Sequence, residues 1–123
     1  MQKIIKFLAA ILISVFAVSA LTACASSEPL DMKSVSAVID VRTPAEFATG
    51  HLAGAVNFDI QGADFATQVE TLDKAANYVV YCHSGNRAGK AVSYMQDHGF
   101  TGTVTNAGGV ADAAATTGLA LVQ

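Results

Sequence analysis

The residues of this chain best suited to chemistry are Cys82 and Arg87. Four residues lie between them: His83, Ser84, Gly85 and Asn86. A cysteine reacts as its thiolate, which nearby positive charge or backbone N–H groups stabilise. Such a thiolate can attack a phosphate ester or accept a sulfane sulfur. This segment therefore predicts a nucleophilic loop.

The residues on either side of the loop predict a turn between a strand and a helix. Residues 78–81 are apolar, and Ala88, Ala91 and Met95 recur at the spacing of one helix face. In such a turn several N–H groups lack helical partners, and the helix dipole makes their surroundings electropositive. We expect the amides of residues 83–87 to stabilise a thiolate or persulfide on Cys82.

The length of the loop separates the possible thiol chemistries. A thioredoxin-type redox site has a second cysteine at the position that Gly85 occupies, so that class is excluded. Cysteine-dependent phosphatases place one more residue between cysteine and arginine, which makes a cradle wide enough for a tetrahedral oxyanion. The shorter loop of this chain fits a terminal sulfur better than a phosphoryl group. Sulfur transfer is therefore favoured, with phosphatase or arsenate reductase chemistry as the weaker alternative.

Asp40 and Arg42 end a first predicted strand, residues 35–41. The favoured role of this pair is a structural ion pair or loop anchor that supports the cysteine loop. Next, Thr43 as N-cap and Pro44 at the first helical position predict a short helix. The pair is thus expected where a strand passes into a helix.

Other polar side chains have roles that the sequence leaves more open. Arg87 either binds an anionic donor or pairs with an acid such as Asp40. His83 either contacts the acceptor or is solvated, and Ser84 could donate a hydrogen bond to bound sulfur. His51 is expected to hold its turn by a hydrogen bond, and His98 to lie on the surface. Because no three such side chains show metal-ligand spacing, we predict no metal. Persulfide chemistry at Cys82 would also need no cofactor.

The elements expected along the chain alternate between strands and helices. Strands are predicted at 35–41, 78–81 and 103–106, with a short strand after a turn within 51–58 and 119–122 as a fifth. Helices are predicted from Thr43 to Gly50, between about 60 and 74, at 87–97 and at 110–116. Such alternation implies an α/β fold: an open parallel sheet of four to five strands with helices on both faces. Ligands bind such sheets at the carboxyl ends of strands, where Cys82 falls.

The N-terminal segment has the composition of a targeting sequence. Residues 1–23 carry two lysines, no acid and an apolar run of about 12 residues, as in a signal peptide. The segment ends in Leu21-Thr22-Ala23-Cys24, which resembles the lipobox of bacterial lipoproteins. We expect a cleaved lipoprotein signal, a lipid on Cys24, a tether at 24–32 and a domain at 33–123. The protein would then be exported and anchored in the cell envelope.

Charge limits the possible partners of the mature protein. Loss of Lys3 and Lys6 changes the formal net charge from −3 to −5. The remaining chain has no basic cluster, so a nucleic-acid partner is not expected. If lipid occupies Cys24, Cys82 is the only free thiol of the mature chain.

Four segments together resemble the single-domain rhodanese-like sulfurtransferases. They fall in the family order: Asp40-Val41-Arg42-Thr43-Pro44-Ala45-Glu46-Phe47, Gly50-His51-Leu52-Ala53-Gly54-Ala55-Val56-Asn57, Cys82-His83-Ser84-Gly85-Asn86-Arg87-Ala88 and Gly108-Gly109. Each segment is weak alone, but the set is specific to this family.

The resemblance implies a function for the cysteine loop. Cys82 would take sulfur from a donor such as thiosulfate, hold it as a persulfide and pass it to a thiol or to cyanide. A non-catalytic binding module with the same fold is the alternative. Two features depart from the family: the chain has no tryptophan, and Glu46 stands where some tandem-domain thiosulfate sulfurtransferases have a basic residue.

Overall fold

The computed structural model describes residues 30–123. The predicted signal peptide, the lipidation site Cys24 and most of the predicted tether lie outside this part of the chain. At its start, the N–H of Leu30 donates a hydrogen bond of 3.1 Å to the carbonyl oxygen of Thr116. A short 3-10 helix, η1 (Met32–Ser34), then leads into the first strand. Among residues 30–123, no helix is both long enough and apolar enough to cross a membrane.

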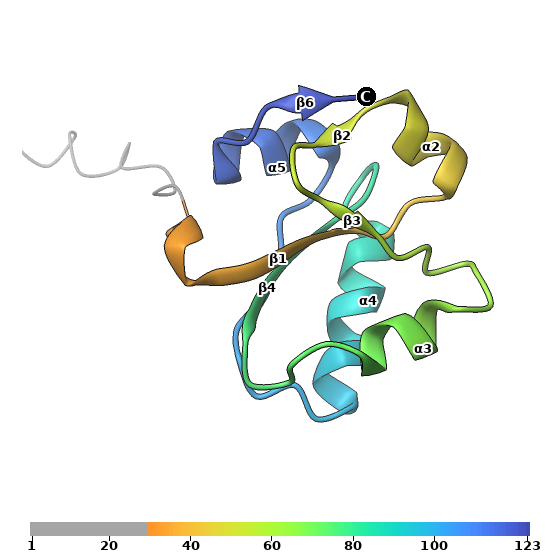
Figure 1. The fold of residues 1–123 in the computed structure, drawn as a ribbon, viewed down its shortest axis with the longest axis vertical. Coiled ribbons are helices and arrows are strands. Elements are labelled where there is room, and N and C mark those ends of the chain that lie inside the picture. The colour runs from red at the N-terminus through yellow and green to blue at the C-terminus, as the bar shows by residue number, and fades with distance from the viewer. Residues whose placement is uncertain (1–29) are drawn as a thin grey trace, which may run out of the picture.

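Four parallel strands form the main sheet, in the order β3-β1-β4-β5 (Figure 1). They are β1 (Val35–Asp40), β3 (Val56–Asn57), β4 (Asn77–Tyr81) and β5 (Val104–Asn106). The two central strands, β1 and β4, pair with Asp40 opposite Tyr81. Their apolar sequences follow from burial on both faces. The predicted open parallel α/β fold is confirmed.

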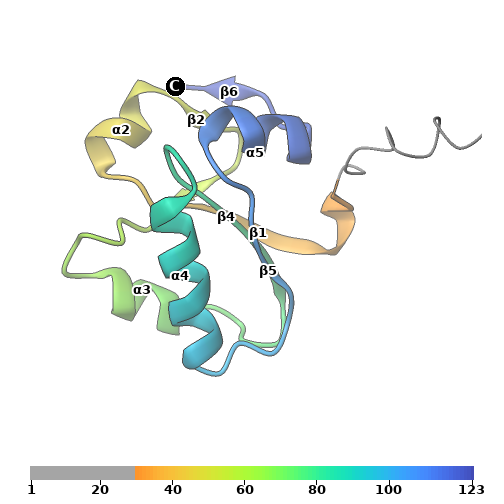
Figure 2. The same ribbon diagram turned by 180° about the vertical axis from the view of Figure 1, so that it is seen from behind.

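Separate hydrophobic clusters cover the two faces of this sheet. Figures 1 and 2 show α3 (Phe65–Glu70) and α4 (Asn86–Asp97) on one side, with α5 (Val110–Thr117) near the other. The first cluster contains Ile39, Val41, Phe65, Val69, Tyr78, Val80, Cys82, Ala88, Ala91, Met95, Phe100 and Val104. The second contains Val38, Leu52, Val79, Tyr81, Ala107 and Ala113. Alternate residues of β4 thus enter opposite clusters, as strand geometry requires.

The last strand does not extend the main sheet. β6 (Leu121–Val122) pairs antiparallel with β2 (His51–Leu52) in a separate two-stranded sheet. Gly118 follows α5 with a φ of +72°, a left-handed conformation that suits glycine and turns the chain back. The N–H of Ala53 then donates to the carbonyl oxygen of Ala120 at 2.8 Å. The parallel sheet therefore has four strands, not five.

Local sequence features determine where the two helices before the cysteine loop begin. α2 (Pro44–Thr49) begins as predicted, and Thr43 and Glu46 form a capping box at its N-terminus. α3 is shorter than the predicted 60–74 segment, because a turn closed by the Gly62 N–H and the Asp59 carbonyl precedes it. The apolar residues of the predicted segment nevertheless face the core, since Ile60 and Leu72, outside the helix, pack against the first cluster.

Candidate active site

Cys82 lies directly after β4, at the carboxyl edge of the main sheet, and is fully buried. Its N–H donates to the carbonyl oxygen of Gly108 at 3.0 Å, which fixes the start of the loop. Its sulfur accepts a hydrogen bond of 2.9 Å from the N–H of Gly85. Gly85 has a φ of +92°, a conformation that side-chain-bearing residues rarely adopt. The glycine thus allows a loop amide to point at the sulfur.

A turn after β5 supports the loop from its other side. Asn106 donates from Nδ2 to the carbonyl oxygen of Gly85 at 3.1 Å, and its Oδ1 accepts from the N–H of Gly108 at 2.9 Å. A Cβ atom on Gly109 would lie only 2.4 Å from the carbonyl oxygen of His83. The Gly108-Gly109 pair is therefore a contact surface for the cysteine loop. The glycine pair was expected from the sequence, but Asn106 was not, because its only sequence signal is its place at the end of a strand two residues before Gly108.

Arg87 binds Glu46 in α2. Two hydrogen bonds, of 2.8 and 2.9 Å, join the guanidinium to the two carboxylate oxygens of Glu46. Of the two roles predicted for Arg87, the structure shows the pairing with an acid. Asp40, the acid suggested as its partner, was wrong, because Asp40 forms an ion pair with Arg42. Hydrogen bonding by Arg87 lowers the pKa of Glu46 to about 2, and the same contact raises the pKa of Arg87. Arg87 therefore joins the start of α4 to α2.

Asp40 and Arg42 form the predicted ion pair at the end of β1, where Asp40 lies opposite Tyr81 in the sheet. Both are buried, and Arg42 Nη2 lies 2.6 Å from Asp40 Oδ2 and 2.7 Å from the carbonyl oxygen of Gly50. The hydrogen bond to Asp40 is the main reason that the pKa of Arg42 is raised. Asn57 also donates from Nδ2 to the carbonyl oxygens of both residues, at 3.1 and 2.9 Å. The pair thus anchors the segment around Gly50 to the sheet edge that carries Cys82.

The remaining predicted residues divide between loop surface and structural contacts. His83 and Ser84 are exposed on the loop, and Asn86 is exposed at the first residue of α4. His51 holds its turn as predicted: its Nδ1 lies 2.9 Å from the carbonyl oxygen of Phe47, and the two rings stack. His98 is exposed, also as predicted.

The chemistry available at the site is that of a thiol whose sulfur accepts a hydrogen bond from one backbone N–H, at the start of a helix. Within residues 30–123, no group of three or more His, Cys, Asp or Glu side chains could hold a metal ion. The described part of the chain holds one cysteine, Cys82, and it is free. The N–H of Gly85 and the N-terminal end of α4 place partial positive charge at the sulfur. Such an arrangement can stabilise a thiolate or a sulfur anion attached to it.

Comparison with known proteins finds a matching family model and relatives named as thiosulfate sulfurtransferases. The family model for the rhodanese-like domain matches residues 25–115. The chain is 34% identical over 76 residues to thiosulfate sulfurtransferase PspE of Escherichia coli strain K12. The aligned segment covers 62% of this chain and 72% of that protein. It is 40% identical over 81 residues to the chloroplastic thiosulfate sulfurtransferase 16 of Arabidopsis thaliana, over 58% of this chain and 68% of that one.

This chain is also similar to a solved structure in three dimensions. The chain resembles a structure described as rhodanese with anions from E. coli, with a TM-score of 0.58 and 32% sequence identity. The likeness covers 71% of this chain and 96% of the other.

Proposed function

Because this chain belongs to the rhodanese-like domain family, we propose that it is a sulfurtransferase that carries sulfane sulfur on Cys82. The donor would be a small molecule such as thiosulfate, and the acceptor a thiol or cyanide. The observation that carries the proposal is the hydrogen bond of 2.9 Å from the Gly85 N–H to the Cys82 sulfur. This contact lies at the N-terminus of a 12-residue helix, α4.

The reaction would proceed in two displacement steps. First, the Cys82 thiolate attacks the outer sulfur of thiosulfate. A new sulfur–sulfur bond forms at Cys82, the sulfur–sulfur bond of thiosulfate breaks, and sulfite leaves with the bonding electron pair. Next, cyanide or an acceptor thiolate attacks the outer sulfur of the persulfide. This step restores the Cys82 thiolate and releases thiocyanate or the acceptor persulfide.

The cysteine loop would lower the activation barrier of each step, because its N–H donor stabilises negative charge without having to move. In each step the negative charge passes through the sulfur atoms at Cys82, where the Gly85 N–H is already oriented. Donors that are fixed before the reaction stabilise such charge better than water, which must reorganise. Support of Gly85 by Asn106, and of Arg87 by Glu46, would keep this orientation.

The test is turnover of thiosulfate and cyanide by the purified domain. We expect thiocyanate and sulfite in equal amounts, and loss of at least about a thousandfold in rate for Cys82→Ser, because the nucleophile itself is removed. Turnover that survives in Cys82→Ser would overturn the assignment of this cysteine. Phosphate-ester hydrolysis that depends on Cys82, without sulfur transfer, would instead revive the phosphatase interpretation.

We also propose that the protein is exported and lipid-anchored at Cys24. Support comes from the lipobox-like Leu21-Thr22-Ala23-Cys24 after a basic start and an apolar run. In the native cell, Cys24→Ala should prevent acylation and move the protein out of the membrane fraction. A wild-type protein that carries no lipid, by intact-mass analysis of the envelope fraction, would contradict this proposal.

A further inference from the structure

Most basic side chains in the described part of the chain are already paired. Arg42 pairs with Asp40, Lys74 with Glu70 and Arg87 with Glu46. Among residues 30–123, the other two basic residues, Lys33 and Lys90, form no ion pair, and both are exposed. Lys33 lies in η1, before the first strand, whereas Lys90 lies in the helix that starts at the cysteine loop.

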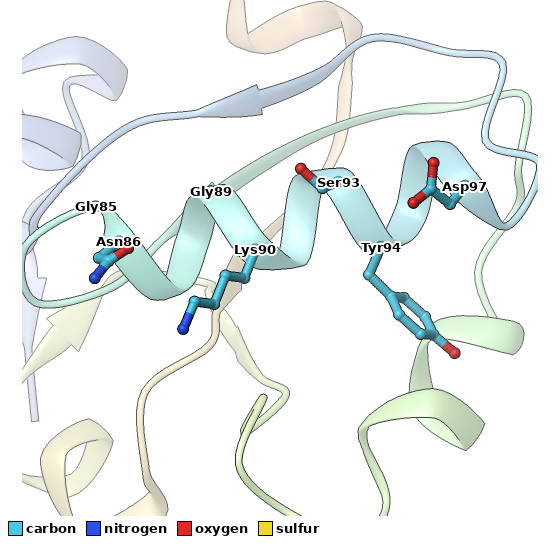
Figure 3. Close-up of a pocket in the computed structure, with 7 residues that line it drawn as sticks. All are labelled: Gly85, Asn86, Gly89, Lys90, Ser93, Tyr94 and Asp97. Carbon is cyan, nitrogen blue, oxygen red and sulfur yellow. The ribbon is translucent and has the colours of Figure 1, made fainter.

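Lys90 borders a groove that continues from the cysteine loop. The groove has a volume of about 490 Å³ and is lined by Gly85, Asn86, Gly89, Lys90, Ser93, Tyr94 and Asp97. Gly85 and Asn86 belong to the loop itself, and Gly89 leaves the surface between the longer side chains open. In Figure 3, Lys90 extends back toward the N-terminal end of α4, near Asn86. The side chain is thus directed toward the end of the groove that Gly85 lines, and the N–H of Gly85 donates to the Cys82 sulfur.

The two charged side chains that line the groove, Lys90 and Asp97, have opposite signs. Asp97 closes the far end, seven residues beyond Lys90 and about 10 Å farther along the helix axis. An anion in the groove would be attracted to the loop end and repelled from the Asp97 end. Arg87, although nearer the cysteine in sequence, has its charge compensated by Glu46. Among residues 30–123, Lys90 is therefore the basic side chain near the loop that forms no ion pair.

We propose that Lys90 binds the oxyanion part of an anionic sulfur donor, such as the sulfonate group of thiosulfate or of a thiosulfonate. This inference rests on the proposed function and adds a specificity-determining residue to it. Lys90 would attract the donor while its outer sulfur reacts at Cys82. Sulfite, which leaves, is also an anion, so Lys90 acts on binding of donor and product rather than on the breaking bond. The proposal predicts an effect on donors with an oxyanion and none on neutral acceptors.

The test compares Lys90→Gln with Lys33→Gln, which removes the same charge far from the loop. For each protein, the rate constant of Cys82 persulfide formation is measured against thiosulfate concentration at low ionic strength. We expect Lys90→Gln to lower the second-order rate constant about fivefold, the effect of one partly exposed charge contact. Lys33→Gln should change it by less than about twofold, and Lys90→Arg should retain most of the rate.

A second measurement separates donor binding from damage to the site. The preformed persulfide is discharged with an uncharged phosphine, which takes the outer sulfur as phosphine sulfide and restores the Cys82 thiolate, and all variants should react at the wild-type rate. An unchanged thiosulfate rate in Lys90→Gln, or an equal loss in both glutamine variants, would overturn the role of Lys90 while leaving the sulfurtransferase proposal intact. If the wild-type protein forms no persulfide with thiosulfate, the proposed use of this donor fails and the inference fails with it.

Discussion

At the scale of single residues, the site depends on backbone positions more than on reactive side chains. Cys82 supplies the nucleophile, but its hydrogen-bond partners are main-chain groups of Gly85 and Gly108. Asn106 holds both of these glycines with one side-chain amide. Substitutions that move the loop backbone should therefore affect sulfur transfer as strongly as changes to polar side chains nearby.

Gly109→Ala should reduce both sulfur transfer and stability. The new Cβ atom would lie 2.4 Å from the carbonyl oxygen of His83, so the loop must shift. Gly109 has a φ of −78°, which alanine also adopts, so the effect would come from the collision. We expect at least about a tenfold loss of kcat/KM and about 1–3 kcal/mol of destabilisation, as for other overpacked sites.

Gly89→Ala is the matched control for that substitution. Gly89 lies inside α4, and its nearest contact for an added Cβ is Asn106 Nδ2 at 3.4 Å. Alanine favours a helix interior over glycine by up to about 1 kcal/mol. Thermal unfolding should show Gly89→Ala at or above wild-type stability. Equal losses in the two variants would argue against a specific contact between Gly109 and the loop.

At the scale of elements, α2 and α4 are joined by Glu46 and Arg87, which are 41 residues apart in sequence. Glu46 has two structural roles, because it also completes the capping box of α2 with Thr43. The pair connects the first turn of α4, which faces the cysteine sulfur, to the helix that follows the buried Asp40–Arg42 pair. The position of the loop thus depends on a contact between helices.

Glu46→Gln should remove an acid-sensitive part of the stability. Because the pKa of Glu46 falls from 4.5 to about 2 on folding, its contribution is present above pH 4.5 and is lost as the pH falls toward 2. Since the side chain is one-third exposed, we expect a loss of only about 1 kcal/mol at neutral pH, after allowance for solvent screening. Urea unfolding between pH 7 and pH 2.5 should show a smaller decrease for the variant than for wild type.

The control for this pH series is Glu70→Gln. Glu70 pairs with Lys74 on the surface of the protein, and both side chains are at least 40% exposed. Such pairs contribute little to stability. If both glutamine variants change the pH dependence equally, the Arg87 contact does not have the role assigned to it.

At the scale of the whole molecule, the alternation of strands and helices could be predicted from the sequence because it is local. Apolar runs identified β1 and β4, Thr43-Pro44 marked the start of α2, and helical periodicity identified α4. The bond from a loop amide to the Cys82 sulfur also followed from the expected strand-to-helix turn. Local patterns were therefore sufficient to locate the central strands and the cysteine after β4, but they left open whether residues 119–122 join the main sheet.

Contacts between distant segments could not be predicted in the same way. The pairing of β6 with β2 joins residues about 70 positions apart, and neither two-residue strand has a distinct periodicity. The partner of Arg87 was also unpredictable, because several acids were available and only the fold places Asp40 against Arg42. The role of Asn106 depends on two turns meeting in space.

The buried ion pair gives a prediction at this scale. Asp40→Ala would leave the Arg42 guanidinium buried without its counter-charge, and such a change costs about 3–5 kcal/mol. Urea unfolding should show that loss, whereas Asp64→Ala, at an exposed position that makes no side-chain cap bond, should stay within about 0.5 kcal/mol of wild type. A small effect of Asp40→Ala would mean that the pair does not hold the sheet edge together.

The most direct test of the central claim is the mass of the protein after exposure to a sulfur donor. Wild-type domain incubated with thiosulfate, then freed of donor, should gain one sulfur atom, about 32 Da, on Cys82. Cyanide should remove that mass and release thiocyanate, and Cys82→Ser should gain none. If thiosulfate, polysulfide and thiosulfonate all leave the mass of the wild-type domain unchanged, Cys82 does not carry sulfur and the account is contradicted.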